Sequence, residues 1–136
     1  MLLPTRTFRT HCVVEFPEVV DIANAAAVRA GLNRVIADHV PPHGALIADL
    51  TGSRFVTATA LSVLVETRRR LEPRGVELRA VGSAPLVCKV FSVTGLHKAI
   101  PFHRDLRDAL APAGNGNPPL AALPAPTPRR AVPSRV

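Results

Sequence analysis

The sequence of 136 residues contains no tryptophan, no tyrosine and only two cysteines. Cys12 and Cys88 stand alone, without a CxxC pair, which leaves a disulfide framework and a cysteine-ligated zinc site unsupported and predicts reduced, mostly buried thiols. No apolar run approaches the roughly 18 residues that a membrane-spanning helix requires, and Pro4 and Arg6 interrupt the N-terminus where a secretory signal is apolar. We therefore expect a cytoplasmic protein that does not contact a membrane.

The common catalytic and phosphate-binding signatures are also missing. The sequence has no GxxxxGK[ST] loop, no GxGxxG fingerprint, no GxSxG elbow and no HExxH pair. His39 and His43 are separated by two prolines, which prevent them from sharing a helical face as zinc ligands do. For His97 and His103 no catalytic partner is identifiable. These absences favour a binding protein over an enzyme and predict neither a metal nor a cofactor.

Proline and charge divide the chain into unequal parts. Of the 14 prolines, half lie at 112–136 among Ala, Gly and Asn, and such a segment buries too little apolar surface to offset its conformational entropy. It carries three arginines and no acidic residue, so of the formal charge of +7 the preceding residues hold +4. We expect a single mildly basic domain at 11–111, an extension or edge strand at 1–10 and a disordered tail at 112–136.

Four short runs of apolar and β-branched residues predict strands, at 11–16, 45–50, 76–81 and 100–102. The run at 45–50 is nearly continuous, which is typical of a central strand covered on both faces, whereas the run at 76–81 alternates. Helical spacing fills the intervals between the runs. This alternation predicts an α/β fold with a small, mostly parallel or mixed sheet and about four α-helices.

Capping residues and apolar spacing place the helices. Asn24 is predicted to cap the first helix, Thr57 or Thr59 the second, and Ser83 the third. The expected apolar faces are Val28, Leu32, Val35 and Ile36 in the first helix; Leu61, Leu64, Val65 and Leu71, with the stem of Arg68, in the second; Leu86, Val90, Phe91 and Val93 in the third; and Leu106, Ala109 and Leu110 in the last.

Two charged features have alternative interpretations. The run from Arg68 to Arg70 is typical of a helix C-terminus, where the macrodipole favours cations, and is less typical of a phosphate-binding patch because few aromatic residues accompany it. A small basic nucleic-acid-binding protein is therefore the less favoured competing class. Asp49 ends the central strand, where open α/β sheets place ligands, but a structural pair with Arg54 is favoured.

Three segments carry a family resemblance: FPEVVDIANAAAVRAGL, LIADLTGSRFVTATALSVLVETRRRLEPRGVELRAVGS and PLVCKVFSVTGLHKAIPFHRDLRDAL. They contain D-I-x-N, D-L-T, F-V-x-x-x-x-L-x-V-L, G-V-x-L and V-x-G-L in succession. From Phe16 to Leu110 the chain thus resembles the STAS domain of bacterial anti-sigma factor antagonists. The resemblance implies that the protein binds an anti-sigma factor of the serine-kinase type, which frees a sigma factor for transcription, and that phosphorylation before the second helix ends this interaction.

The sequence departs from that family at the phosphorylation motif. The family's pattern is Asp-Ser-x-Gly, with the serine as acceptor, whereas Thr57, Ala58, Thr59 and Ala60 stand in these places. Ala58, at the acceptor position, has no hydroxyl to phosphorylate. Three interpretations follow: a divergent antagonist without the standard switch; an antagonist in which Thr57 or Thr59, both also suited to capping, takes the phosphate; and a STAS interaction or scaffold module for another partner.

The resemblance also implies where a partner docks. The surface would comprise Asp21 and Asn24 at the start of the first helix, the segment 57–60, and Ser62 on the outward side of the second helix. Plainer roles exist for three of these residues, because Asp21 can bond nearby backbone, Asn24 can cap, and Ser62 can be an ordinary exposed position. The protein is expected to be a monomer or a weak homodimer.

Overall fold

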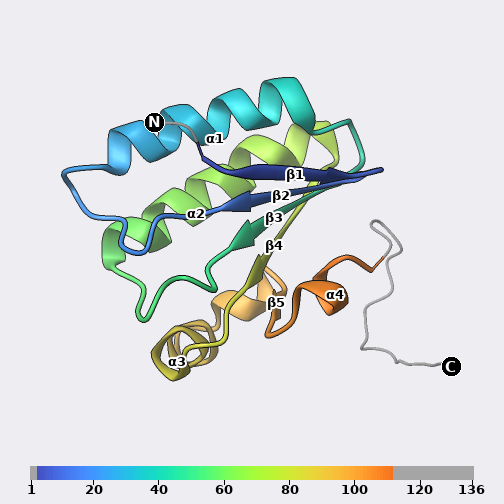
Figure 1. The fold of residues 1–136 in the computed structure, drawn as a ribbon. Helices are drawn as coiled ribbons and strands as arrows, with labels where there is room; N and C mark the ends of the chain where they lie inside the picture. Colours follow the sequence, from blue (N-terminus) through green and yellow to red (C-terminus); the bar gives the residue numbers. More distant parts are fainter. Residues whose placement is uncertain (1–2, 112–136) are drawn as a thin grey trace, which may run out of the picture.

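In the computed structural model, which describes residues 3–111, a five-stranded sheet carries helices on both faces (Figure 1). The strand order is β1-β2-β3-β4-β5; β1 and β2 are antiparallel, and all other neighbours are parallel. The predicted α/β fold is thereby confirmed, with the edge strand β1 making the sheet mixed. The tail predicted for 112–136 lies outside the described residues. The strands are β1 (Thr5–Phe8), β2 (His11–Glu15), β3 (Ala45–Asp49), β4 (Glu77–Val81) and β5 (Phe102–His103).

Four α-helices connect or follow the parallel strands: α1 (Ala25–His39), α2 (Ala58–Leu71), α3 (Pro85–Val93) and α4 (Leu106–Ala109). Two 3₁₀ turns, η1 (Glu72–Arg74) and η2 (Leu96–Lys98), follow α2 and α3. Between residues 3 and 111, no helix combines the length and the hydrophobicity required to cross a bilayer.

The main core lies between the sheet and the helices α1, α2 and α3. All of β3 is buried, as the continuous apolar run predicts. The register aligns Cys12 of β2 with Leu46 of β3, and Leu46 with Leu78 of β4. These three side chains form a row across the sheet on the face that packs against the helices. The predicted apolar face of α1 enters this core completely, with Val28, Leu32, Val35 and Ile36 all buried.

The buried face of α2 differs from the predicted one. Val63 and Thr67 are buried, whereas Leu61 and Val65 are only half-buried. The hydroxyl of Thr67 donates to the carbonyl oxygen of Val63 at 2.7 Å, so this polar side chain enters the core with its hydrogen bond satisfied. Apolar spacing alone does not find such a residue, because Thr67 is polar in the sequence.

The predicted face of α3 is wrong in two positions. The core takes Val87 and Phe91, and the Phe91 ring stacks on that of Phe102 with 4.5 Å between the centroids. Leu86 and Val93 point away from it, with 57% and 73% of their surface exposed. The predicted cap is also wrong: Ala84 is the N-cap instead of Ser83, because Pro85 occupies the first turn, where a missing backbone N–H costs nothing.

The opposite face of the sheet carries a smaller core beneath α4. Val13, Ile47 and Val81 pack here against Ala109 of α4. Arg79, although charged, is only 6% exposed and donates to the carbonyl oxygens of Ala109 at 2.5 Å and Ala111 at 2.7 Å. The ring of the buried His11 also donates to the Ala111 carbonyl, at 2.7 Å. The last turn of the domain is therefore held by side chains of β2 and β4.

Both cysteines are free thiols. Cys12 is completely buried in β2, and burial raises the pKa of its thiol, an effect that a hydrogen bond to Thr7 partly opposes. Cys88 in α3 is half-buried. A protonated, buried thiol such as Cys12 behaves as a small apolar side chain, and its burial agrees with the buried thiol predicted from the sequence.

Candidate functional site

The helices α1 and α2 begin at the same end of the sheet, next to the carboxyl ends of β2 and β3 (Figure 1). The segments that precede these helices lie together there and form the candidate site, which we call the α1–α2 corner. It contains the residues for which the family resemblance implies a docking role, namely Asp21, Asn24, the segment 57–60 and Ser62. Open α/β sheets place their binding surfaces at the carboxyl ends of the parallel strands.

Asp21 and Asn24 are bonded to each other across a tight turn before α1. The Asp21 carboxylate accepts from the backbone N–H of Asn24 at 3.1 Å, and the Asn24 amide oxygen accepts from the N–H of Asp21 at 2.9 Å. The Asn24 amide nitrogen donates to the Val19 carbonyl at 2.9 Å. Asn24 occupies the N-cap position as predicted, but its side chain makes no capping bond to the helix because these turn contacts occupy it.

Thr57 connects the two halves of the corner. It is the N-cap of α2, and its hydroxyl oxygen accepts from the backbone N–H of Ala60 at 3.0 Å. The same hydroxyl donates to the carbonyl oxygen of Val20, in the segment that leads into α1. Of the two threonines proposed from the sequence as caps, Thr57 therefore has this role. Thr59, two residues further along, does not, and it is half-buried.

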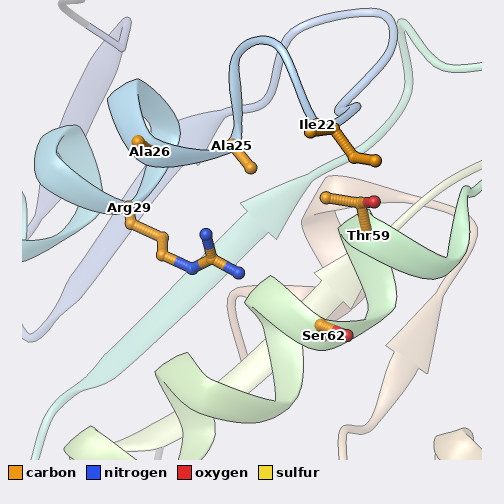
Figure 2. Close-up of a pocket in the computed structure, with 6 residues that line it drawn as sticks. All are labelled: Ile22, Ala25, Ala26, Arg29, Thr59 and Ser62. Carbon is orange, nitrogen blue, oxygen red and sulfur yellow. The ribbon is translucent and has the colours of Figure 1, made fainter.

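An open hollow of about 290 Å³ lies between the two helices (Figure 2). Its wall on the α2 side includes Thr59 and the exposed Ser62. Arg29 of α1 reaches across toward α2, where its guanidinium meets the Glu66 carboxylate in two contacts of 2.8 and 3.3 Å. The two helices are thus joined beneath a depression that remains accessible. The lining residues are Ile22, Ala25, Ala26, Arg29, Thr59 and Ser62.

The sequence-predicted site residues differ in accessibility. Ala58 and Ser62 are exposed, and Thr59 faces the hollow, whereas Ala60 is only 5% exposed. Ala60 contributes to the corner through its backbone N–H, which bonds Thr57, and through packing in the core. Its methyl group therefore offers almost no contact area to a partner.

Sequence reasoning missed two exposed apolar residues at the corner. Ile22 is 88% exposed and borders the hollow, and Phe55, in the segment before α2, is 46% exposed. The signal for Ile22 was its position in the turn between Asp21 and Asn24, outside the periodic apolar face of α1. An apolar side chain that belongs to no buried face is a candidate for contact with another molecule.

Asp49 does not pair with Arg54, so that prediction is wrong. Its carboxylate accepts from the backbone N–H of Thr51 at 2.9 Å and from the Thr51 hydroxyl at 2.6 Å, which closes the turn after β3. Its charged neighbour is Arg6 of β1, at 4.0 Å. Arg6 lies on the antiparallel edge strand β1, more than 40 residues from Asp49 in the sequence, so no local pattern predicts this pair.

The arginine run lies in the last turn of α2, as the plainer interpretation predicts. Arg68 contacts Glu72 at 3.3 Å and donates to the carbonyl oxygen of Ala99 at 2.9 Å, while Arg70 donates to the side chain of Asn33. These contacts lie at the end of the helix remote from the corner.

The two histidines beside β5, His97 and His103, differ in their surroundings. His97 donates from Nδ1 to the carbonyl oxygen of Phe91 at 2.9 Å. Burial lowers the pKa of His103, and the positive charge of Arg79 lowers it further, against opposing effects of Asp108 and Glu77. In the part of the chain from 3 to 111, no group of three His, Cys, Asp or Glu side chains is arranged to hold a metal ion.

The sequence and the fold are similar to those of known proteins. The model of the STAS domain matches residues 3–109. A candidate anti-anti-sigma factor of Mycobacterium tuberculosis is 33% identical over 67 residues, which cover 49% of this chain and 45% of that protein. The match thus spans less than half the length of that curated relative.

Several solved structures have a fold similar to that of this chain. An anti-sigma factor antagonist from Mycobacterium paratuberculosis superposes with a TM-score of 0.69 and 27% identity, over 79% of this chain and 89% of that one. The antagonist SpoIIAA in its unphosphorylated form gives a TM-score of 0.62 at 17% identity, over 79% and 92%. An anti-sigma-factor antagonist domain protein from Planctomyces limnophilus has a TM-score of 0.65 and is 15% identical, with 80% of this chain and 95% of that chain covered. The last two similarities show the shared fold.

Proposed function

The chain belongs to the STAS domain family, and we propose that it is an anti-sigma factor antagonist that uses the α1–α2 corner to bind an anti-sigma factor. Binding would release a sigma factor and so regulate transcription. The relatives from the two Mycobacterium species support this role, since their names describe an anti-anti-sigma factor and an anti-sigma factor antagonist. We further propose that the anti-sigma factor is of the serine-kinase type and that this protein acts by binding, without catalysis.

The observation that carries the proposal is the exposed apolar side chain of Ile22 beside the hollow between α1 and α2. Protein interfaces obtain most of their affinity from a few apolar or aromatic anchors surrounded by polar groups. Ile22 and Phe55 provide two such anchors, and the Thr59 and Ser62 hydroxyls provide polar contacts beside them. The Asp21–Asn24 turn and the Thr57 bridge hold these groups in place, which lowers the entropic cost of binding.

We propose that the standard phosphorylation switch is absent. Ala58 is exposed at the acceptor position and has no hydroxyl. The Thr57 hydroxyl is engaged in two hydrogen bonds that join α2 to the segment before α1, so its modification would break both. Thr59 borders the hollow at a helix N-terminus, which would stabilise an attached phosphate. In the alternative interpretation Thr57 or Thr59 is the acceptor, and the bonds of Thr57 favour Thr59.

The binding proposal is tested by capture from the cytosol of the native bacterium with the tagged full chain. The wild-type protein is expected to retain an anti-sigma factor, identified by mass spectrometry. Ile22→Asp and Ala58→Asp should each reduce its recovery about tenfold or more, because each puts a charge into the interface. Ala37→Asp, the same change at an exposed alanine in the second half of α1, is the matched control. Undiminished recovery with both corner variants contradicts the assignment of the corner.

Phosphorylation is tested separately, by incubating the protein with ATP and the captured anti-sigma factor. Mass spectrometry is expected to find no phosphate on residues 57–59. Phosphate on Thr57 or Thr59, lost in the corresponding Thr57→Val or Thr59→Val variant, would establish the alternative interpretation, in which the switch has moved by one residue. Recovery of a scaffold or sensory protein in place of an anti-sigma factor would instead establish the third interpretation, a STAS module for another partner.

A further inference from the structure

Most of the circumference of the helix α3 is apolar. Within Pro85–Val93, only Lys89 and Ser92 have polar side chains. Apolar side chains of a helix normally face a core, yet in α3 the core covers only the side with Val87 and Phe91. The outward side presents Leu86 and Val93, whose exposed fractions are 57% and 73%, with the half-buried Val90 between them. We call Leu86, Val90 and Val93, at i, i+4 and i+7, the α3 stripe.

The surroundings of the α3 stripe are positively charged. Lys89 is an exposed residue of the helix itself, and Lys98 is exposed in η2. The segment 83–104 contains two lysines and one arginine and no acidic residue. Arg68 of α2 donates to the carbonyl oxygen of Ala99, which places this guanidinium beside η2, where it also contacts Glu72 at 3.3 Å. Within residues 3–111, neither lysine makes an ion pair.

We propose that the α3 stripe is a second docking surface, separate from the α1–α2 corner, and that it binds an acidic amphipathic helix of a partner protein. Such a helix would place its own apolar face on Leu86, Val90 and Val93 and its carboxylates next to Lys89 and Lys98. In Figure 1, α2 lies between α1 and α3, so the α3 stripe belongs to a different helix from the α1–α2 corner. Ile22 of the corner and Leu86 and Val93 of the stripe are all exposed. A STAS protein with two such surfaces joins two partners.

Charge complementarity selects this occupant over two others. In a symmetric pair of chains, the same surface faces itself, so Lys89 and Lys98 of one copy would approach those of the other. The chain's own segment at 112–136 carries three arginines and no acidic residue, which also gives repulsion. A partner helix rich in Asp or Glu meets the apolar stripe and neutralises the lysines.

The experiment places a photo-crosslinking amino acid at position 93 of the full chain in the native bacterium. The crosslinked segment is then sequenced by mass spectrometry. The expected product is a segment of another protein with apolar residues at helical spacing and an excess of Asp and Glu. The crosslinker at the exposed Ala37 is the control for random contacts. A crosslink to lipid, to a second copy, to residues 112–136 or to a segment without acidic excess overturns the proposal, as does no crosslink.

A second measurement uses the crosslinked segment as a synthetic peptide. Its affinity for the purified full chain should fall about tenfold in Leu86→Asp and roughly 3- to 10-fold in Lys89→Glu, and should weaken with added salt. Ile22→Asp should bind the peptide as the wild type does, which separates this proposal from the one for the corner. Circular dichroism confirms that the variants fold. Unchanged affinity in folded Leu86→Asp and Lys89→Glu overturns the α3 stripe.

Discussion

The two faces of the sheet bury side chains by different means. On one face, α1, α2 and α3 cover a continuous apolar core that includes Leu46, Leu64 and Phe91. On the other, the four-residue α4 covers only a small apolar cluster, and Arg79 and His11 bond the carbonyl oxygens at its end. The first arrangement is stabilised mainly by apolar area removed from water, the second by a few buried hydrogen bonds. We therefore expect α4 to open locally before the main core does.

The largest effect is expected for Phe91→Ala on the face with three helices. The ring is 1% exposed and stacked on Phe102, so its loss leaves a cavity and should lower the free energy of unfolding by about 3–5 kcal/mol. Urea denaturation measures this change. The control is Leu106→Ala on the half-buried side chain of α4, for which about 1 kcal/mol is expected. Equal losses in the two variants would abolish the distinction between the faces.

A smaller effect is expected for Arg79→Met on the α4 face. Methionine replaces most of the buried volume but donates no hydrogen bond to Ala109 or Ala111, which should cost about 1–3 kcal/mol. Loss of the ion pair with Glu77 should add little to this cost, because the Glu77 side chain is 42% exposed and water can solvate its carboxylate in the variant. Hydrogen exchange should become faster in α4 and remain unchanged in α1. Arg69→Met, the same change at an exposed site, is the control; unchanged exchange in α4 would contradict the role given to Arg79.

Thr57→Ala probes a polar contact on the three-helix side. The change removes the cap on Ala60 and the bond to Val20, so a loss of about 1 kcal/mol is expected in thermal or urea unfolding. Thr57→Ser, which keeps the hydroxyl, should recover most of the loss. Thr59→Ala should stay within about 0.5 kcal/mol of the wild type. If Thr59→Ala were the more damaging variant, the assignment of the cap would be wrong.

The smallest effect concerns pH and His103, on the α4 face. Burial and Arg79 lower its pKa in the folded state, with Asp108 and Glu77 opposing, so the unfolded chain binds the proton more readily. The free energy of unfolding should therefore decrease as the pH falls through the ordinary value of 6.5, and the contribution is complete above that value. His103→Gln should flatten this dependence. A dependence as steep in His103→Gln as in the wild type would contradict the prediction.

Much of the fold was predictable because its signals are local. The buried face of α1 follows the apolar spacing of Val28 to Ile36, and the central strand follows the continuous run at 45–50. The buried faces of α2 and α3 were predicted less well. In α2 the hydrogen-bonded Thr67 lies in the core, and in α3 apolar residues on two sides of the helix could equally have been the buried ones. At the corner, the position of Thr57 as a cap was predictable, but its bond to Val20 joins distant segments.

By itself, the sequence determined the alternation of strands and helices and the absence of a hydroxyl at Ala58, because spacing, capping and residue identity are local properties. Only the tertiary structure decided that Ile22 stands beside Thr59 and Ser62, that Arg79 is buried against the end of α4, and that Leu86 and Val93 remain exposed. The physical reason is that packing between remote segments selects one among several faces that local pattern leaves equivalent.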